Sequence, residues 1–313
     1  MSGATAGSAA GAANSSAVYS SLREVGERGA IVSIGNFDGV HRGHRELLAR
    51  MRTLADEQSR PALVITFFPP TKVVFSDAHY LSSAEEKVEL LSAFAPADIV
   101  VLPFDRDYAN TDKSVFLAQL RSLAPHTIVV GEDFRFGHQR AGGLDDLRSV
   151  ANEVEAFGLV TVGGAVVRSS GIRAALQSGA IDVANRLLGE PYPVSGTVVS
   201  GARRGRTIGY PTANIVSGER KALPIGVFAV SIDTPAGNFL GMANVGPRPS
   251  FPDEPPSLEV NIFDFVGDLY DQRVTTRFHA YLRSQRKFAG LDELKTQLAA
   301  DEAAARSVLI SGV

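Results

Sequence analysis

The chain of 313 residues contains no cysteine. That absence excludes disulfide bonds, catalytic thiolates and zinc sites built on sulfur. It also fits a reducing compartment, which leads us to expect a cytoplasmic protein. No apolar run reaches the roughly 18 residues that a membrane-spanning helix requires, so we expect no membrane partner.

An excess of either charge is missing as well. The formal net charge is −3 and the isoelectric point is about 6.1, whereas general binding to nucleic acid or to an anionic membrane needs a basic surface. We therefore expect no nucleic-acid partner, although a local basic pocket stays open. Hydrophobic residues make up 44% of the chain and charged residues 21%, which is typical of a globular protein with a buried core.

The first 17 residues have neither the cationic start nor the apolar centre of a signal peptide. Small and polar residues fill this stretch, so we expect a disordered tail over residues 1–17. The remaining length suits two domains. The pattern of the sequence changes near Gly189, which divides the rest of the chain into predicted domains over residues 18–188 and 189–313.

Residues 18–188 alternate between apolar runs and helical patterns. The apolar runs are continuous, as in buried parallel strands, and they cover residues 30–37, 62–68, 98–104, 127–134 and 159–167. Amphipathic or capped patterns predict helices over residues 44–58, 83–94, 112–123 and 144–158. Strands that alternate with helices predict an α/β Rossmann-like domain with a parallel sheet.

The second half of the chain has a different pattern. A glycine-interrupted helical stretch covers residues 169–189, and short strands separated by Gly and Pro follow within residues 194–288. This pattern predicts an antiparallel barrel or sandwich, and we expect a small antiparallel β-barrel. A C-terminal helix is expected over residues 291–309.

The motif GNFDGVHRGH, residues 35–44, follows the first predicted strand. Ligands of parallel sheets bind beyond the carboxyl ends of the strands, and a helix N-terminus favours phosphate. Gly35 and Gly43 let the backbone approach a ligand closely. His41 and His44 are suited to donate hydrogen bonds to the charge that develops when an α-phosphate is attacked. Ordinary surface histidines are one alternative; a metal site is another, but no nearby His, Cys or acidic cluster completes it.

This motif resembles the G-x-F-D-x-x-H-x-G-H signature of the nucleotidyltransferase superfamily, in the branch found in bacterial bifunctional riboflavin kinase/FAD synthetases. Two further segments resemble that family: VGEDFRFGHQRAGG, residues 130–143, and RSSGIRAAL, residues 168–176. The resemblance implies catalytic roles for His41 and His44. It also implies two sets of binding residues, for nucleotide and phosphate (Gly35, Asn36, Asp38, Gly43, Ser169, Ser170 and Arg173) and for flavin (Asp133, Phe134 and Phe136).

The chain departs from the family pattern in two places. The family's T-F-x-P-H-P segment is TFFPPT here, residues 66–71, with Pro70 where a histidine is usual. Arg168 stands where the first serine of the S-S-T-x-I-R segment is usual. These departures keep an alternative open, in which the N-terminal module is inactive or uses another nucleotide or flavin analogue. If the lost histidine is the cause, Pro70→His should raise FAD formation.

A second motif opens the C-terminal half. Residues 195–215, SGTVVSGARRGRTIGYPTANI, resemble the riboflavin kinase motif G-x-V-x-x-G-x-x-x-G-R-x-x-G-x-P-T-A-N. Gly201 and Gly209 suit a loop that wraps phosphates with its backbone amides, and Arg206 adds positive charge. A solvated basic turn is the plain alternative for the arginines.

The same half of the chain carries candidate metal ligands and a candidate base. Thr212 and Asn214, two residues apart, would place two oxygen ligands on one face of an extended segment, which suits Mg²⁺. In LEVNIFDF, residues 258–265, Glu259 stands in the position of the family's catalytic base. A solvent-facing carboxylate is the alternative that alternation alone leaves open. The resemblance also implies flavin binding near LRSQRKFAG, which contains Arg283.

The resemblance covers residues 30–306, nearly all of the expected ordered chain. It implies a bifunctional enzyme that phosphorylates riboflavin to FMN in the C-terminal domain and adenylylates FMN to FAD in the N-terminal domain. Its partners would be riboflavin, FMN and ATP, with Mg²⁺ as cofactor. A non-catalytic flavin-binding regulator is a further alternative, against which the candidate base argues because binding alone needs no base. A homo-oligomer stays open.

Overall fold

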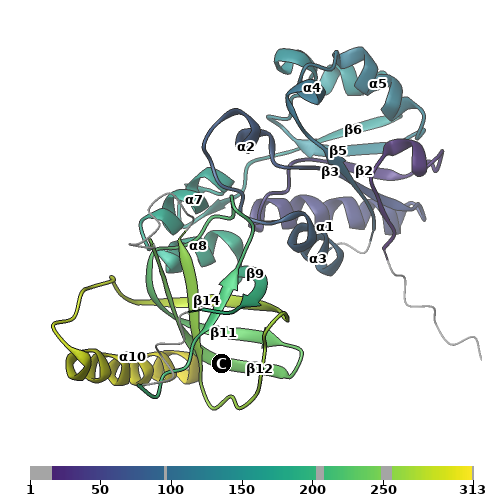
Figure 1. Ribbon diagram of the computed structural model, residues 1–313. Helices are drawn as coiled ribbons and strands as arrows, with labels where there is room; N and C mark the ends of the chain where they lie inside the picture. The colour runs from purple at the N-terminus through teal and green to yellow at the C-terminus, as the bar shows by residue number, and fades with distance from the viewer. Residues whose placement is uncertain (1–15, 95–96, 202–207, 248–255, 312–313) are drawn as a thin grey trace, which may run out of the picture.

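The structure is a computed structural model, and it describes residues 16–94, 97–201, 208–247 and 256–311. Figure 1 shows a sheet domain and a barrel domain, with helices α7 (Ser169–Gln177) and α8 (Ile181–Leu188) between them. Within the described ranges, no helix is both long enough and apolar enough to cross a membrane.

The N-terminal domain is a six-stranded sheet in which all the strand pairings are parallel. In spatial order the strands are β1 (Val18–Tyr19), β4 (Asp98–Pro103), β3 (Ala62–Phe68), β2 (Ile31–Ile34), β5 (Thr127–Gly131) and β6 (Glu153–Phe157). The predicted Rossmann-like parallel sheet is confirmed.

Successive residues of a strand point to opposite sides of the sheet, and these strands are continuously apolar, so both faces of the sheet are apolar. Helices cover both faces. The helices between its strands are α1 (Arg42–Glu57), α2 (Thr71–Phe75), α3 (Ala84–Phe94), α4 (Arg106–Ala109), α5 (Lys113–Arg121) and α6 (Leu144–Leu147). Met51 of α1 belongs to the same buried cluster as Ile31 of β2. Leu120 of α5 belongs to another cluster with the next strand residue, Val32. The sheet therefore separates two apolar cores.

The expectation for residues 144–167 is wrong. The helix predicted over residues 144–158 ends after one turn as α6, and the residues EVEAF form the edge strand β6. The strand predicted over residues 159–167 is instead a small hairpin of β7 (Thr161–Val162) and β8 (Ala165–Val166), turned by two glycines at positive φ. Glu and Ala favour a helix locally, but pairing with β5 satisfies the backbone of β6 and overrides that preference.

The C-terminal domain is a closed barrel whose strand pairings are all antiparallel. Its strands are β9 (Tyr192–Val199), β10 (Ala213–Val216), β11 (Gly226–Thr234), β12 (Gly237–Gly246), β13 (Ser257–Ile262) and β14 (Arg273–Arg283). Helix α10 (Leu291–Ser311) packs on the barrel through Ala305 and Leu309, which contact the cluster of Met242 and Phe263. The barrel with its C-terminal helix is confirmed, and the sandwich is excluded.

A buried polar network joins the two domains. Lys221, in the loop between β10 and β11, lies with its Nζ 2.6 Å from Oε2 of Glu86 in α3, and the two side chains are 1% and 3% exposed. The same ammonium donates to the carbonyl oxygens of Leu81 and Pro193. The Tyr192 hydroxyl of β9 also lies 3.1 Å from the Leu81 carbonyl oxygen. Burial lowers the pKa of Lys221, and the neighbouring Glu86 opposes that shift. The segment before α3 is thus fixed against the barrel.

Candidate active sites

The first candidate site is built on the loop between β2 and α1. Phe37 and Val40 have φ values of 43° and 39°, a backbone conformation that is costly for residues other than glycine. Hydrogen bonds hold the loop in this form. Oδ1 of Asp38 accepts from the backbone N–H groups of Leu81 and Ser82 at 2.8 and 3.2 Å. The loop is therefore shaped by the protein before any ligand arrives.

His41 and His44 stand together at the start of α1. Their rings are stacked, with centroids 3.6 Å apart and planes 14° apart. His41 is the N-cap of the helix, and its Nδ1 accepts from the His44 backbone N–H. Burial lowers the pKa of His41 to about 4. Burial, His41 and Lys87 together hold the pKa of His44 well below its usual value. Both imidazoles are therefore neutral at pH 7, and each carries one N–H donor.

A buried cation lies beneath this loop. Lys87 of α3 is fully buried, and its Nζ donates to the carbonyl oxygens of Asn36 at 2.8 Å and Phe67 at 2.6 Å. Burial lowers the pKa of Lys87 to about 8, so the ammonium is mostly charged at pH 7. It ties the end of β3 to the loop after β2. No local pattern indicates this role, because a lysine in a helix is ordinarily exposed.

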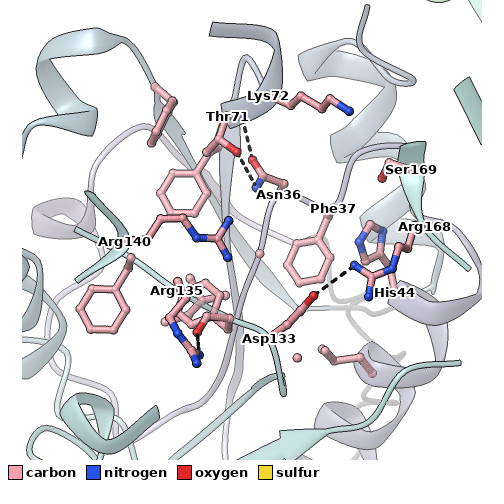
Figure 2. Close-up of a pocket in the computed structure, with 18 of the residues that line it drawn as sticks. Asn36, Phe37, His44, Thr71, Lys72, Asp133, Arg135, Arg140, Arg168 and Ser169 are labelled. Carbon is pink, nitrogen blue, oxygen red and sulfur yellow. Dashed lines mark hydrogen bonds and ion pairs between the residues drawn. The ribbon is translucent and has the colours of Figure 1, made fainter. Parts of the chain in front are cut away.

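The two histidines line a cavity of about 880 Å³. Aromatic side chains make up much of its wall: Phe67, Phe75, Phe104, Tyr108, Phe116, Phe134 and Phe136. In Figure 2 the polar groups of His44, Arg168 and Ser169 stand on one side of the cavity, and Lys72 extends toward that side. Aromatic surface together with a few polar groups suits ligands that combine flat rings with charged phosphates.

Most of the residues predicted for the N-terminal site meet at this cavity. Its wall includes Gly35, Asn36, His41, Gly43, His44, Asp133, Phe134, Phe136 and Ser169. Asp38, Ser170 and Arg173 are not among the described residues that line it. Asp38 is 2% exposed and forms an ion pair with Arg173. These two side chains support the loop from behind.

The altered segment TFFPPT makes a contact that the motif did not predict. The Thr71 backbone N–H donates to Asn36 Oδ1 at 3.0 Å, and Asn36 Nδ2 donates to Thr71 Oγ1 at 3.2 Å (Figure 2). Proline, which the family pattern has at position 71, lacks the N–H that makes the first of these bonds. Pro70 is the N-cap of α2 and is not among the described residues of the wall. Two cavity residues of α2, Thr71 and Lys72, were thus missed at the sequence level.

The second candidate site lies on the barrel. The register of the strands places Glu259 of β13 opposite Asn214 of β10 and Asn244 of β12. Leu258 is buried and Glu259 is only partly buried, as the alternation predicts. A Cβ at Gly201 would collide with the side-chain amide of Asn214. Only glycine therefore lets the Asn214 amide lie so close to the chain at this point.

The other residues predicted for this site are placed as follows. Thr212 is exposed, and Gly209 has a φ of 85°, which suits glycine. Arg206 lies outside the described residues. Arg283 Nη2 contacts Asp301 Oδ2 of α10 at 2.7 Å, so its guanidinium holds the C-terminal helix. Flavin binding by Arg283 stays a prediction.

The oxygen donors of the barrel fit Mg²⁺. Thr212 and Asn214 offer neutral oxygens, and Glu259 lies across the strand pair from Asn214. Mg²⁺ usually keeps several waters and binds substrate phosphates beside one or two protein oxygens. Among the described residues, no group of three or more His, Cys, Asp or Glu could hold a metal ion. A metal on this barrel would therefore rely on few protein ligands and on the substrate.

Comparison with known proteins gives two family matches. The family described as FAD synthetase matches residues 24–171, and the family described as riboflavin kinase matches residues 188–309. The two matches follow one another along the chain and correspond to the sheet domain and the barrel.

Similar proteins extend over nearly the same length. A bifunctional riboflavin kinase/FMN adenylyltransferase of Pseudomonas fluorescens is 37% identical over 294 residues, which cover 90% of this chain and 93% of the relative. The protein of that name from Escherichia coli K12 is 35% identical over 91% of this chain and 94% of its own. A crystal structure from Streptococcus pneumoniae, titled a macrolide-efflux protein, superposes with a TM-score of 0.82 at 32% identity, covering 93% of this chain and 98% of that one.

Proposed function

The chain belongs to the bifunctional riboflavin kinase/FMN adenylyltransferase family, and from this premise we propose how its two sites share the reactions. The barrel transfers the γ-phosphoryl group of ATP to riboflavin, which gives FMN and ADP. The sheet domain transfers the adenylyl group of ATP to FMN, which gives FAD and pyrophosphate. The chain is thus a transferase of FAD biosynthesis. The lack of cysteine supports a cytoplasmic location.

The stacked pair of His41 and His44 on the cavity wall carries the adenylyltransferase assignment. An oxygen of the FMN phosphate forms a bond to the α-phosphorus of ATP, and the bond from that phosphorus to the oxygen of the β-phosphate breaks, so pyrophosphate leaves. The negative charge that develops on the α-phosphate oxygens is stabilised by the N–H donors of the neutral imidazoles. Backbone N–H groups at the start of α1 add to this effect. The aromatic wall holds the rings of the substrates.

In the barrel, the cross-strand position of Glu259 beside Asn214 supports its role as the base. The terminal hydroxyl of the ribityl chain attacks the γ-phosphorus of ATP, the hydroxyl proton passes to the Glu259 carboxylate, and ADP leaves. Thr212 and Asn214 would hold Mg²⁺, which when bound neutralises charge on the phosphates. Phosphoryl transfer of this kind depends mainly on position and charge neutralisation.

An endpoint assay tests this proposal. The full chain is incubated with riboflavin, ATP and Mg²⁺, and the flavins are separated by chromatography while pyrophosphate is measured. We expect FMN first and FAD with pyrophosphate afterwards. FMN without FAD would overturn the adenylyltransferase half and favour a module of altered nucleotide specificity. Bound riboflavin without ATP consumption would overturn both halves and favour a flavin-binding regulator.

A further inference from the structure

Arg168 and Asp133 form an ion pair across the cavity of the sheet domain (Figure 2). Arg168 immediately precedes α7, and Asp133 lies two residues beyond the end of β5. The distance from Arg168 Nη1 to Asp133 Oδ2 is 3.4 Å, and the two side chains are 51% and 60% exposed. Both line the cavity, and Arg168 stands on the same side as His44.

The charges of the cavity wall are unequal. Its lining includes the cations Lys72, Arg135, Arg140 and Arg168. Asp133 is the one carboxylate among the described residues that line it. A cavity with this balance attracts anions, and Asp133 opposes that attraction. Because exposed ion pairs add little stability, Asp133 holds Arg168 only weakly.

Arg173, which the family resemblance assigns to phosphates, is occupied elsewhere. Its guanidinium is paired with Asp38, whose side chain is 2% exposed, and it also donates to the His79 carbonyl oxygen. Moving it to a ligand would leave Asp38 buried without its partner, which is strongly unfavourable. It would also remove one of the contacts of the Asp38 carboxylate that supports the loop carrying the histidines. Arg168 loses only a solvent-exposed ion pair when it leaves Asp133.

We propose that Arg168 binds a substrate phosphate of the adenylyl transfer, and that Asp133 is the competing partner which the phosphate displaces. A guanidinium presents two parallel N–H groups to a phosphate, and a phosphate dianion attracts it more strongly than a solvated carboxylate does. A serine, which the family pattern has at position 168, offers neither the charge nor the reach. This inference rests on the proposed function and adds to it a phosphate-binding residue that departs from the family pattern.

Steady-state kinetics of FAD formation test the proposal with Arg168→Ser, Arg168→Lys and Asp133→Asn. KM is measured for FMN at saturating ATP and for ATP at saturating FMN, so that the two sources of the phosphate are distinguished. We expect Arg168→Ser to raise the KM of one substrate roughly 10- to 100-fold, since it removes a charge-assisted hydrogen bond. The KM of Arg168→Lys should lie between those of the unaltered chain and Arg168→Ser, because lysine keeps the charge but lacks the two parallel N–H groups of the guanidinium. Asp133→Asn should lower the same KM about 2- to 5-fold.

Two controls accompany these variants. Riboflavin phosphorylation takes place in the barrel of the same chain, and it should be unchanged in all of them. Arg186→Ser removes another exposed arginine, paired with Asp182 at 3.6 Å on α8, and it should leave both KM values unchanged.

The opposite signs expected for Arg168→Ser and Asp133→Asn separate this proposal from a structural role. If both variants raise KM alike, Asp133 is a structural contact or a flavin-binding residue and not a competitor of the phosphate, and the proposal is overturned. An unchanged KM in Arg168→Ser also overturns it. If the unaltered chain forms no FAD, the proposed function fails by itself. Equilibrium binding of FMN and of a non-hydrolysable ATP analogue to the same variants then tests Arg168 without turnover, with the same expected signs.

Discussion

The two candidate sites are constructed in different ways. In the sheet domain, the loop between β2 and α1 is held from behind by buried groups: Asp38 accepts from two backbone N–H groups, and Lys87 donates to two carbonyl oxygens. On the barrel, Thr212, Asn214 and Glu259 lie on or beside neighbouring strands, and none of the three is fully buried. One site depends on interior hydrogen bonds, and the other depends on strand register.

This difference separates catalytic from structural effects of mutation. A substitution among Thr212, Asn214 and Glu259, none of which is fully buried, is expected to change chemistry more than folding. A substitution at Asp38 or Lys87 is expected to change both chemistry and folding, because buried polar groups lose their hydrogen bonds. Since each reaction can be assayed in the same chain, each domain serves as the control for the other.

The largest effect is expected for Glu259→Gln. Loss of a general base should lower the rate of riboflavin phosphorylation roughly 10²- to 10⁴-fold. Adenylylation of supplied FMN and the melting temperature should stay unchanged. Separate assays with riboflavin and with FMN check this. A comparable loss in both reactions would show that Glu259 has a structural role and would break the contrast between the sites.

The buried pair of Lys221 and Glu86 should show the opposite behaviour. Lys221→Met leaves the Glu86 carboxylate buried without its cation and should lower the free energy of unfolding by about 3–5 kcal/mol. Urea unfolding measures this, with Lys295→Met on the exposed side of α10 as the matched control. The double variant Glu86→Gln, Lys221→Met should cost less than the sum of the two single changes. An unchanged urea midpoint in Lys221→Met would show that the buried pair does not stabilise the fold.

The histidine pair is expected to matter to one reaction alone. His41→Asn removes an imidazole from the cavity but keeps a side chain that can cap α1. The rate of FAD formation should fall roughly 10²- to 10³-fold, as for other donors that stabilise transition-state charge. Riboflavin phosphorylation should be unchanged. Wild-type rates of FAD formation in this variant would remove His41 from the mechanism.

Acid should destabilise the sheet domain through the same residue. The pKa of His41 is about 4 in the folded protein, against 6.5 for an exposed histidine, because the ring is buried. Between these values the unfolded chain binds a proton that the folded chain does not. The free energy of unfolding therefore falls as the pH is lowered, by up to about 3 kcal/mol from this group. Urea unfolding followed by circular dichroism at pH 7 and near pH 4.5 measures the fall, and His41→Asn should reduce it. An equal fall in the variant would assign the effect to other groups.

The sequence predicted the parallel sheet and the barrel because continuous apolar runs and glycine-bounded strands are local signals. It missed β6, because Glu and Ala in EVEAF carry a helical preference that only pairing with β5 reverses. The phosphate role that the resemblance implies for Arg173 stays a prediction, and its pairing with Asp38, 135 residues away in the chain, could not be foreseen from local pattern. The burial of charges such as Lys87 could not be predicted either, since their partners lie far away in the sequence. Local pattern predicts elements and motifs, while contacts between residues far apart in the chain decide which motif residues lie at the cavity.

The segment of Leu81 and Ser82 has a consequence for the modularity of the chain. It contacts Asp38 of the loop between β2 and α1 on one side, and Lys221 and Tyr192 of the barrel domain on the other. A barrel expressed alone from residue 189 would lack Glu86 and would expose the apolar surface that α7 and α8 now cover. The two domains are consecutive in the chain, but they are not structurally independent. In such a fragment Lys221 would lose its buried carboxylate partner, whereas the Tyr192 hydroxyl would keep its hydrogen bond to the Ala222 carbonyl oxygen.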